Sequence, residues 1–334
     1  MPLRIDESRV LYSIPKARSI RELGRLAGVS HSTAKRVVDD LSSRGSFLIV
    51  VDDEYFGFTH VVFIAPFKRV PGSLPYGSRM ALSASSPGGY YIIVVGYVPA
   101  ALSSLYVKGL QEALGKGEVL VTSEVTYWVP LERLRNLRQG EVDVLAEKLE
   151  DFLPRFKKPE KNRMPDAIDL ELLTGKLMFG PYARAWEIIK KLSHLLWHPL
   201  PSYQSVSYHY RLHFYPGWLY TTYHEKRDPS KAPKVALLLK GREAGRVAKA
   251  LASLPVWGVA YTAKRAAVYL GQLEVGYLQA AYDLAHSYGV KVQDGLMLVK
   301  NEVDLGVPHL WRFLDDETKK WVWVRDRVRV PVYL

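Results

Sequence analysis

Residues 19–44, SIRELGRLAGVSHSTAKRVVDDLSSR, decide the fold, because they contain two helices together with their start and stop signals. Ser19 and Ser30 each stand just before a set of apolar residues at helical spacing, where a serine side chain can cap the first turn. Glu22 follows Ser19 at the spacing of a capping box. Gly28 allows a tight turn between the helices, and Gly45 ends the second helix. The stretch therefore predicts a helix-turn-helix.

The residues on both sides extend this motif. Apolar residues between Ile5 and Ile14 recur at helical spacing. Residues 47–58 run from an apolar segment through an acidic turn into an aromatic segment, which predicts two strands joined by a turn. Helices followed by a β-ribbon predict a winged helix-turn-helix over residues 1–58.

The same plan returns in the second half of the chain. Residues 166–173 begin a helix with acids in its first turn, residues 182–192 form a second helix, and Ser202 caps a third. Aligning Ser30 with Ser202 gives an offset of 172 residues between the two copies, about half the chain. A second winged helix-turn-helix is therefore predicted over residues 166–233.

Each helical unit is followed by a β-rich unit. In residues 234–302 the order of predicted elements is βαββαβ, which is the ferredoxin-like order. Residues 59–130 repeat it, except that the first helix is weak because Pro71 and Pro75 interrupt it.

The predicted fold class is α+β, a tandem repeat of a winged helix-turn-helix followed by a ferredoxin-like domain. The expected division is winged helix 1 (1–58), ferredoxin-like domain 1 (59–130), a helical linker (131–165), winged helix 2 (166–233), ferredoxin-like domain 2 (234–302) and a C-terminal β extension (303–334). The alternating residues 321–330 would either add a strand to a second chain or cover a sheet edge of their own chain.

Composition narrows the function classes. The chain has 334 residues and a net charge of +12, and a basic excess favours an acidic partner such as nucleic acid. Cysteine is absent, which excludes disulfides, a cysteine nucleophile and Cys-based metal sites. No run of about 18 apolar residues occurs, so no transmembrane helix is expected. With no secretory signal visible, the cytoplasm is the default location. Few asparagines hint at a thermophilic source.

The order of these elements resembles the Lrp/AsnC family of prokaryotic transcription regulators, in two tandem copies that cover most of the chain. Residues 166–173, DAIDLELL, look like the opening helix of that family. Residues 201–211, PSYQSVSYHYR, look like the recognition helix of its archaeal members, and residues 23–34 fit a generic helix-turn-helix. The resemblance implies a DNA-binding regulator, with no enzymatic activity and no cofactor. It also implies a homodimer, or a pseudo-dimer within one chain.

A recognition helix presents its outward residues to the bases and phosphates of double-stranded DNA. The predicted DNA contacts are His31, Ser32, Thr33, Lys35 and Arg36 in the first copy, Tyr203, Gln204, Ser205, Ser207, Tyr208 and Arg211 in the second, and Lys226 and Arg227 in its wing.

The resemblance also suggests a small-molecule effector in the ferredoxin-like domains. The family carries a Gly-aromatic-Asp turn there, and the matching stretches are residues 89–91 and 264–266, both without the Asp. The weakly predicted ligand residues are accordingly Gly89, Tyr91, Lys264 and Arg265.

Three alternatives remain open. Degenerate winged helices could serve as a protein–protein adaptor. A tetrapyrrole enzyme similar to the siroheme decarboxylases, which resemble Lrp regulators and also occur as two related halves, would need His and Arg or Lys near the sheet. His209 and His213 have metal-ligand spacing, but no Glu follows His209, which favours packed or DNA-facing side chains and no metal.

Overall fold

The computed structural model describes residues 5–130, 164–195, 199–225, 227–254, 257–331 and 334. The predicted linker 131–165 therefore lies almost wholly outside the described residues.

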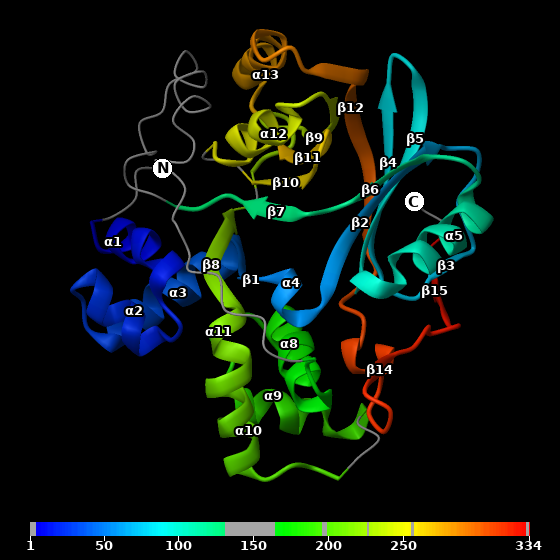
Figure 1. The fold of residues 1–334 in the computed structure, drawn as a ribbon. Helices are drawn as coiled ribbons and strands as arrows, with labels where there is room; N and C mark the ends of the chain where they lie inside the picture. The colour runs from blue at the N-terminus through cyan, green and yellow to red at the C-terminus, as the bar shows by residue number, and fades with distance from the viewer. Residues whose placement is uncertain (1–4, 131–163, 196–198, 226, 255–256, 332–333) are drawn as a thin grey trace.

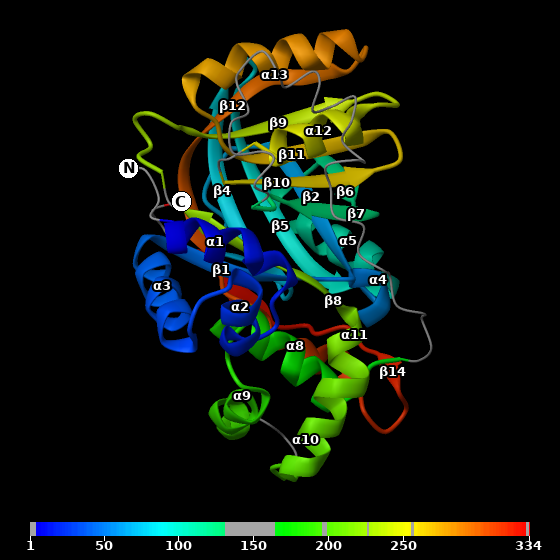
Figure 2. The ribbon, with the colours of Figure 1, turned by 90° about the vertical axis from the view of Figure 1, so that its left-hand side faces the viewer.

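The chain alternates helical and β-rich segments, as the ribbon views show (Figures 1 and 2). The first half contains α1 (Ile5–Ser13), α2 (Ile20–Ala27), α3 (His31–Arg44), β1 (Gly45–Val51), α4 (Asp53–Phe56), β2 (Phe58–Pro66), β3 (Ser73–Pro75), β4 (Ser78–Ser86), β5 (Gly89–Pro99), α5 (Ser103–Leu114), β6 (Glu118–Val121) and β7 (Glu124–Tyr127). The second half contains α8 (Ala167–Phe179), α9 (Ala185–Leu192), α10 (Tyr203–His209), a π-helical turn (Tyr210–Phe214), α11 (Tyr215–Gly217), β8 (Trp218–Glu225), β9 (Lys234–Lys240), α12 (Ala244–Ala252), β10 (Gly258–Ala263), β11 (Ala266–Gln272), α13 (Val275–Ser287) and β12 (Lys291–Asp304).

The predicted helix caps are confirmed. The Ser19 side chain accepts a hydrogen bond from the backbone of Glu22, and that of Ser30 accepts one from Thr33. Gly28 adopts the left-handed conformation that ends α2. The capping box is incomplete, because the Glu22 carboxylate bonds the backbone nitrogen of Arg18 instead of that of Ser19.

The predicted β-ribbon of residues 47–58 is wrong in its second strand. The Asp52 side chain caps a short helix, α4, and Gly57 ends it in the left-handed conformation. The strand β1 pairs instead with β8 from the other half of the chain, antiparallel. In this ladder Ile49 faces Thr221, and their numbers differ by the same 172 residues that separate Ser30 from Ser202. Equivalent residues that pair with each other indicate an internal two-fold relation between the halves.

The strand orders of the two halves show the same relation. The nine-stranded sheet runs β6-β2-β5-β4-β12-β9-β11-β10-β7. Within β6-β2-β5-β4 and within β12-β9-β11-β10, the strands follow the same antiparallel order, with the last strand of each set beside the first. The strand β12 also pairs with β4, and β7, which follows β6 in the chain, pairs with β10. The two sets are thus joined through the β12–β4 pair and through the β7–β10 pair, and apolar side chains from both sets fill the space between them.

The outer faces of the two sets are covered differently. Helices α12 and α13 cover the second set, whereas α5 and the C-terminal segment cover the first. In the first set the short strand β3 stands where the second set has α12. The C-terminal strand β15 (Arg327–Arg329) pairs with β3 within the same chain. Leu310, Phe313 and Val330 join this core, so the C-terminal segment supplies the apolar cover that Pro71 and Pro75 keep a helix from providing.

The second helical unit packs unusually closely. A Cβ at Gly175 of α8 would lie 1.9 Å from Cγ2 of Ile188 in α9, and Ile188 is buried. Ile188 is β-branched, so its side chain has little freedom to rotate away.

Replacing Gly175 with alanine is therefore expected to lower the free energy of unfolding by about 1–3 kcal/mol, because overpacking outweighs the better helix propensity of alanine. Urea denaturation measures the change. Gly245→Ala in α12 is the matched control, since its Cβ would meet Thr262 at an ordinary 3.7 Å. It is expected to be neutral or stabilising. Equal effects of the two substitutions would contradict the packing argument.

The fold class is α+β, because the molecule is built from both helices and strands. No helix within the described ranges is both long and apolar enough to cross a membrane.

Candidate functional site

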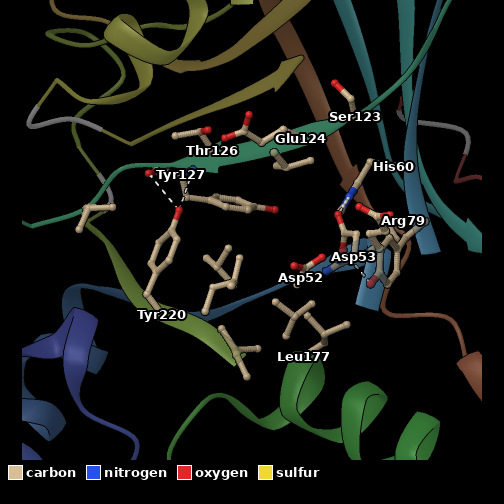
Figure 3. A pocket seen from close by; sticks show the side chains of 18 residues that line it. Asp52, Asp53, His60, Arg79, Ser123, Glu124, Thr126, Tyr127, Leu177 and Tyr220 are labelled. Atoms are coloured by element: carbon tan, nitrogen blue, oxygen red, sulfur yellow. Dashed lines mark hydrogen bonds and ion pairs between the residues drawn. The ribbon is translucent and has the colours of Figure 1, made fainter. Parts of the chain in front are cut away.

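A cavity of about 460 Å³ lies where β1, α4 and β8 meet the closed sheet (Figure 3). Its apolar wall comes from β1, β7, β8 and α8: Ile49, Val50, Val51, Val125, Leu177 and Leu219. Its polar groups come from α4 and from the sheet: Asp53, His60, Arg79, Tyr97 and Tyr127. An apolar pocket with a few converging polar groups is the usual form of a small-molecule site. We call it the Arg79 cavity.

A histidine and a tyrosine share one carboxylate in this cavity. The Nδ1 atom of His60 lies 3.0 Å from one oxygen of Asp53, and the Tyr97 hydroxyl donates to the other oxygen at 2.9 Å. With Nδ1–H donating to Asp53, Nε2 of His60 is the nitrogen left to accept or deliver a proton. The arrangement holds the imidazole in one orientation and one tautomer.

Three tyrosines, Tyr97, Tyr127 and Tyr261, lie near the Asp53 carboxylate. Burial, with the nearby Asp53 carboxylate adding to it, raises the pKa of Tyr97 well above its usual value. Burial likewise raises the pKa of Tyr127 and that of Tyr261. Because burial disfavours the phenolate, these hydroxyls stay protonated and can act as hydrogen-bond donors at neutral pH.

Arg79 provides the cation of the cavity. It is half-buried at the start of β4, and its guanidinium has no hydrogen-bond or ion-pair partner among the described residues. Three of the four acids that line the cavity have partners: Asp52 caps α4, Asp53 binds His60 and Tyr97, and the Glu124 carboxylate lies 2.5 Å from Nζ of Lys249. The fourth, Glu54, is exposed. Arg79 is therefore suited to a carboxylate, which a guanidinium can bind through two parallel hydrogen bonds.

A second cavity of about 740 Å³ lies at the other end of the β1–β8 ribbon, where Ser46, Leu48, His224 and Glu225 line it. His60 and Tyr97 are direct partners across β2 and β5, and the pair at the same place in the second set of strands is Lys234 and Gln272, across β9 and β11. Both of the latter line the second cavity. Nζ of Lys234 lies 2.5 Å from the Glu302 carboxylate and 3.8 Å from the ring centre of Trp257. We call it the Lys234 cavity; it has Lys234 and Gln272 where the Arg79 cavity has His60 and Tyr97.

His224 separates the two cavities. Its ring centre lies 5.7 Å from that of Tyr127, in the Arg79 cavity, and 5.8 Å from that of Trp257, in the Lys234 cavity. Its Nε2 atom is buried without a hydrogen-bond partner among the described residues. Burial, with the charge of Lys234 adding to it, lowers the pKa of His224 to about 3. The imidazole is therefore neutral at physiological pH.

The predicted DNA contacts lie on the surface or close to it. His31, Lys35 and Arg36 are exposed on α3 with Ser32, and Thr33 is half-buried. Tyr203, Gln204, Tyr208 and Arg211 are exposed along α10 and the π-helical turn, with Ser205 and Ser207 half-buried. Lys226 lies outside the described residues, and Arg227 pairs with Glu225 at 3.3 Å beside the Lys234 cavity. Exposure permits DNA contact but does not test it, so DNA binding stays a prediction.

The weakly predicted ligand residues sit at the tips of two hairpins. Gly89 and Tyr91 begin β5 after its turn, and Lys264 and Arg265 form the turn between β10 and β11. None of the four lines either cavity. The residues that do converge, His60, Arg79, Tyr97 and Asp53, were missed in the sequence. A polar histidine in the otherwise apolar strand 60–65 was the one available signal.

The comparisons with known proteins return few matches. No family model matches the chain, and no curated protein matches it. Among solved structures, the siroheme decarboxylase NirDL aligns over 89% of this chain and 91% of its own, with 11% identity and a TM-score of 0.43. The same enzyme in complex with an iron-uroporphyrin III analogue aligns over 90% and 92%, with 11% identity and a TM-score of 0.37.

These findings correct two expectations from the sequence. The assignment to the Lrp/AsnC regulators is wrong as it stands, because no regulator family matches and the matching structures are those of an enzyme. The expectation that the protein is not an enzyme is contradicted by the same matches. The physical reason is that the helix-turn-helix and βαββαβ orders describe a scaffold, whereas function depends on side chains that converge from distant strands.

Proposed function

We propose that this protein is an enzyme that binds a planar, carboxylate-bearing ligand of the tetrapyrrole class in the Arg79 cavity and removes a carboxyl group from it. The observation that carries the proposal is the Arg79 guanidinium, which has no partner among the described residues and lies beside the His60–Asp53–Tyr97 group in an apolar-walled cavity. The two siroheme decarboxylase structures supply the ligand class to test; the support comes from the side chains.

The arrangement provides what a decarboxylation needs. The bond between the carboxylate and its carbon breaks, CO₂ leaves, and the electron pair stays on the carbon, which then takes a proton. The conjugated ring of a tetrapyrrole supplies the electron sink. Arg79 can hold and orient a carboxylate, and His60, oriented by Asp53, can deliver the proton. The apolar wall excludes water, which would otherwise compete for the carboxylate and the carbanion.

The charge of the cavity limits how such a ligand binds. Arg79 is the one lysine or arginine among the described lining residues of this cavity. One carboxylate can therefore be bound inside by an ion pair. The further carboxylates of a uroporphyrin-type ring have to remain at the open side, because burying an unpaired carboxylate costs several kcal/mol.

We further propose that the two halves are tandem copies of a winged helix and a ferredoxin-like unit, divided at the residues expected from the sequence. Two observations support this division: the strand order is the same in both halves, and Ile49 pairs with Thr221, the residue 172 positions later in the chain. It makes one chain a pseudo-dimer, in which the two cavities are counterparts and one has kept the proton-transfer group.

Replacing Arg79 with alanine is expected to weaken the binding of iron-uroporphyrin III about 10- to 100-fold, because one charge-assisted contact is worth about 1.5–3 kcal/mol. Titration of the purified protein, followed by the absorbance of the ring, measures the affinity. The matched control is Lys300→Ala, which removes an exposed cation that lines the Lys234 cavity. It is expected to leave the affinity unchanged. An unmodified protein that does not bind the ring, or equal losses in the two variants, would refute the proposed site.

A further inference from the structure

Two helices of the second helical unit bring four metal-ligand side chains together, away from both cavities. Asp166 and Asp169 stand at the start of α8, and His209 and His213 lie one turn apart where α10 runs into the π-helical turn (Figure 1). One ligand atom from each of the four lies within 4.8 Å of all the others. We call this group the His₂Asp₂ cluster.

The cluster has a tight inner triangle. Oδ1 of Asp169 lies 3.0 Å from Nδ1 of His209 and 3.3 Å from Nδ1 of His213, and the two Nδ1 atoms are 3.1 Å apart. Oδ1 of Asp166 lies 3.3 Å from Nδ1 of His209. Four-coordinate zinc has metal–ligand distances of about 2.0–2.2 Å, which places neighbouring ligand atoms about 3.3 Å apart in a tetrahedron. Four of the six separations, at 3.0–3.3 Å, are close to that spacing, and none of the six exceeds 4.8 Å.

The surroundings of the cluster hold its ligand atoms in place. The second oxygen of Asp169 accepts a hydrogen bond from the backbone nitrogen of Asp166, as half of a complete capping box. The Asp169 side chain is 2% exposed, and those of His209 and His213 are 13% and 16% exposed. The π-helical turn, a distortion often found at functional sites, begins directly after His209 and contains His213. A carboxylate fixed by a backbone hydrogen bond is the usual support of a metal ligand.

Hydrogen bonds alone cannot pair all three contacts of this triangle. Two imidazole Nδ1 atoms that face each other at 3.1 Å can share one proton, because two N–H groups pointing at each other would repel. A cation in the middle would instead satisfy both nitrogens and the buried carboxylate at once.

We infer that the His₂Asp₂ cluster is a binding site for a divalent transition metal ion, with Zn²⁺ as the best match to its nitrogen and oxygen ligands and their spacing. All four positions are filled by protein side chains, so the site is structural rather than catalytic. It joins Asp169 at the beginning of α8 to His209 at the end of α10, about 40 residues later in the chain, and so fixes the angle between the two helices.

The test is metal binding by the full-length protein after treatment with a chelator. Calorimetric titration with Zn²⁺ is expected to show one strong site per chain and a rise in Tm. Co²⁺ in the same site is expected to give the intense visible absorption of tetrahedral coordination. His213→Ala is expected to weaken Zn²⁺ binding at least about 100-fold, since losing even a supporting group costs 10- to 100-fold.

Two further variants make the result decisive. Asp169→Asn removes a ligand but also alters the cap of α8, so His213→Ala, which leaves that cap intact, carries the argument if Asp169→Asn does not fold. His286→Ala, at an exposed histidine of α13, is the matched control and is expected to bind as the parent does. No Zn²⁺ binding, an octahedral Co²⁺ spectrum, or His213→Ala with the affinity of the parent would each overturn the inference. None of these outcomes depends on the Arg79 cavity.

Discussion

Replacing His60 with glutamine is expected to lower the rate of tetrapyrrole decarboxylation about 10²- to 10⁴-fold, the usual contribution of a positioned proton donor. The affinity for iron-uroporphyrin III is expected to change much less, because Arg79 still binds the carboxylate. Glutamine keeps a polar side chain near Asp53 but has no ring nitrogen that could deliver a proton. Release of CO₂ from siroheme, compared with ring binding, separates the two effects.

The control for this substitution is in the other half of the chain. Lys234→Gln changes the residue that occupies the place of His60 in the Lys234 cavity. It is expected to keep the parental rate if the fold is retained, which circular dichroism checks. A His60→Gln variant with the parental rate would exclude His60 as the proton donor. Loss of rate in the Lys234→Gln variant alone would place the chemistry in the other cavity.

The stability of the protein is expected to fall steeply in acid because of His224. The pKa of His224 is about 3 in the folded state, against about 6.5 in the unfolded chain. Between these values the unfolded state binds a proton that the folded state does not. The free energy of unfolding therefore decreases by about 1.4 kcal/mol for each unit of pH below 6.5, or about 5 kcal/mol by pH 3. Above pH 6.5 this contribution is fully present.

Urea denaturation at several pH values tests this expectation. Carboxylates also titrate in acid, so the comparison is between the parent and His224→Leu, whose free energy of unfolding is expected to depend less on pH between 6.5 and 3. Leucine has a similar size and removes the buried Nε2 atom that lacks a partner. His286→Leu, at an exposed position, is expected to keep the parental pH dependence. The same dependence in all three proteins would show that His224 is not the group that titrates.

The two cavities differ in whether their cation has a protein partner. The first contains His60, Tyr97 and Arg79, and Arg79 has no hydrogen-bond or ion-pair partner among the described residues. In the second, the cation is Lys234, at the place that His60 has in the first, and it is already bound by Glu302 and lies over Trp257. A cation that has protein partners has less to offer a carboxylate, since binding would first have to break those contacts.

Local signals in the sequence identified the local structure. The caps at Ser19, Ser30 and Ser202 and the turn at Gly28 are all present, because each depends on side chains within a few residues of the backbone they bind. The acidic residues 52–54 were misread as a turn. Aspartate and glutamate are common in turns and equally common in the first turn of a helix, so their identity alone does not choose between them.

The sequence by itself determined most of the helices, most of the strands and the α+β class, because hydrophobic periodicity and caps act over short distances. The tertiary structure alone decided that β1 pairs with β8, that the two strand sets close on each other, and that the C-terminal segment replaces a helix. It also decided both candidate sites. His60 and Tyr97, or Asp169 and His209, are about 40 residues apart in the chain, and no periodicity records which distant side chains a folded backbone brings within hydrogen-bonding distance.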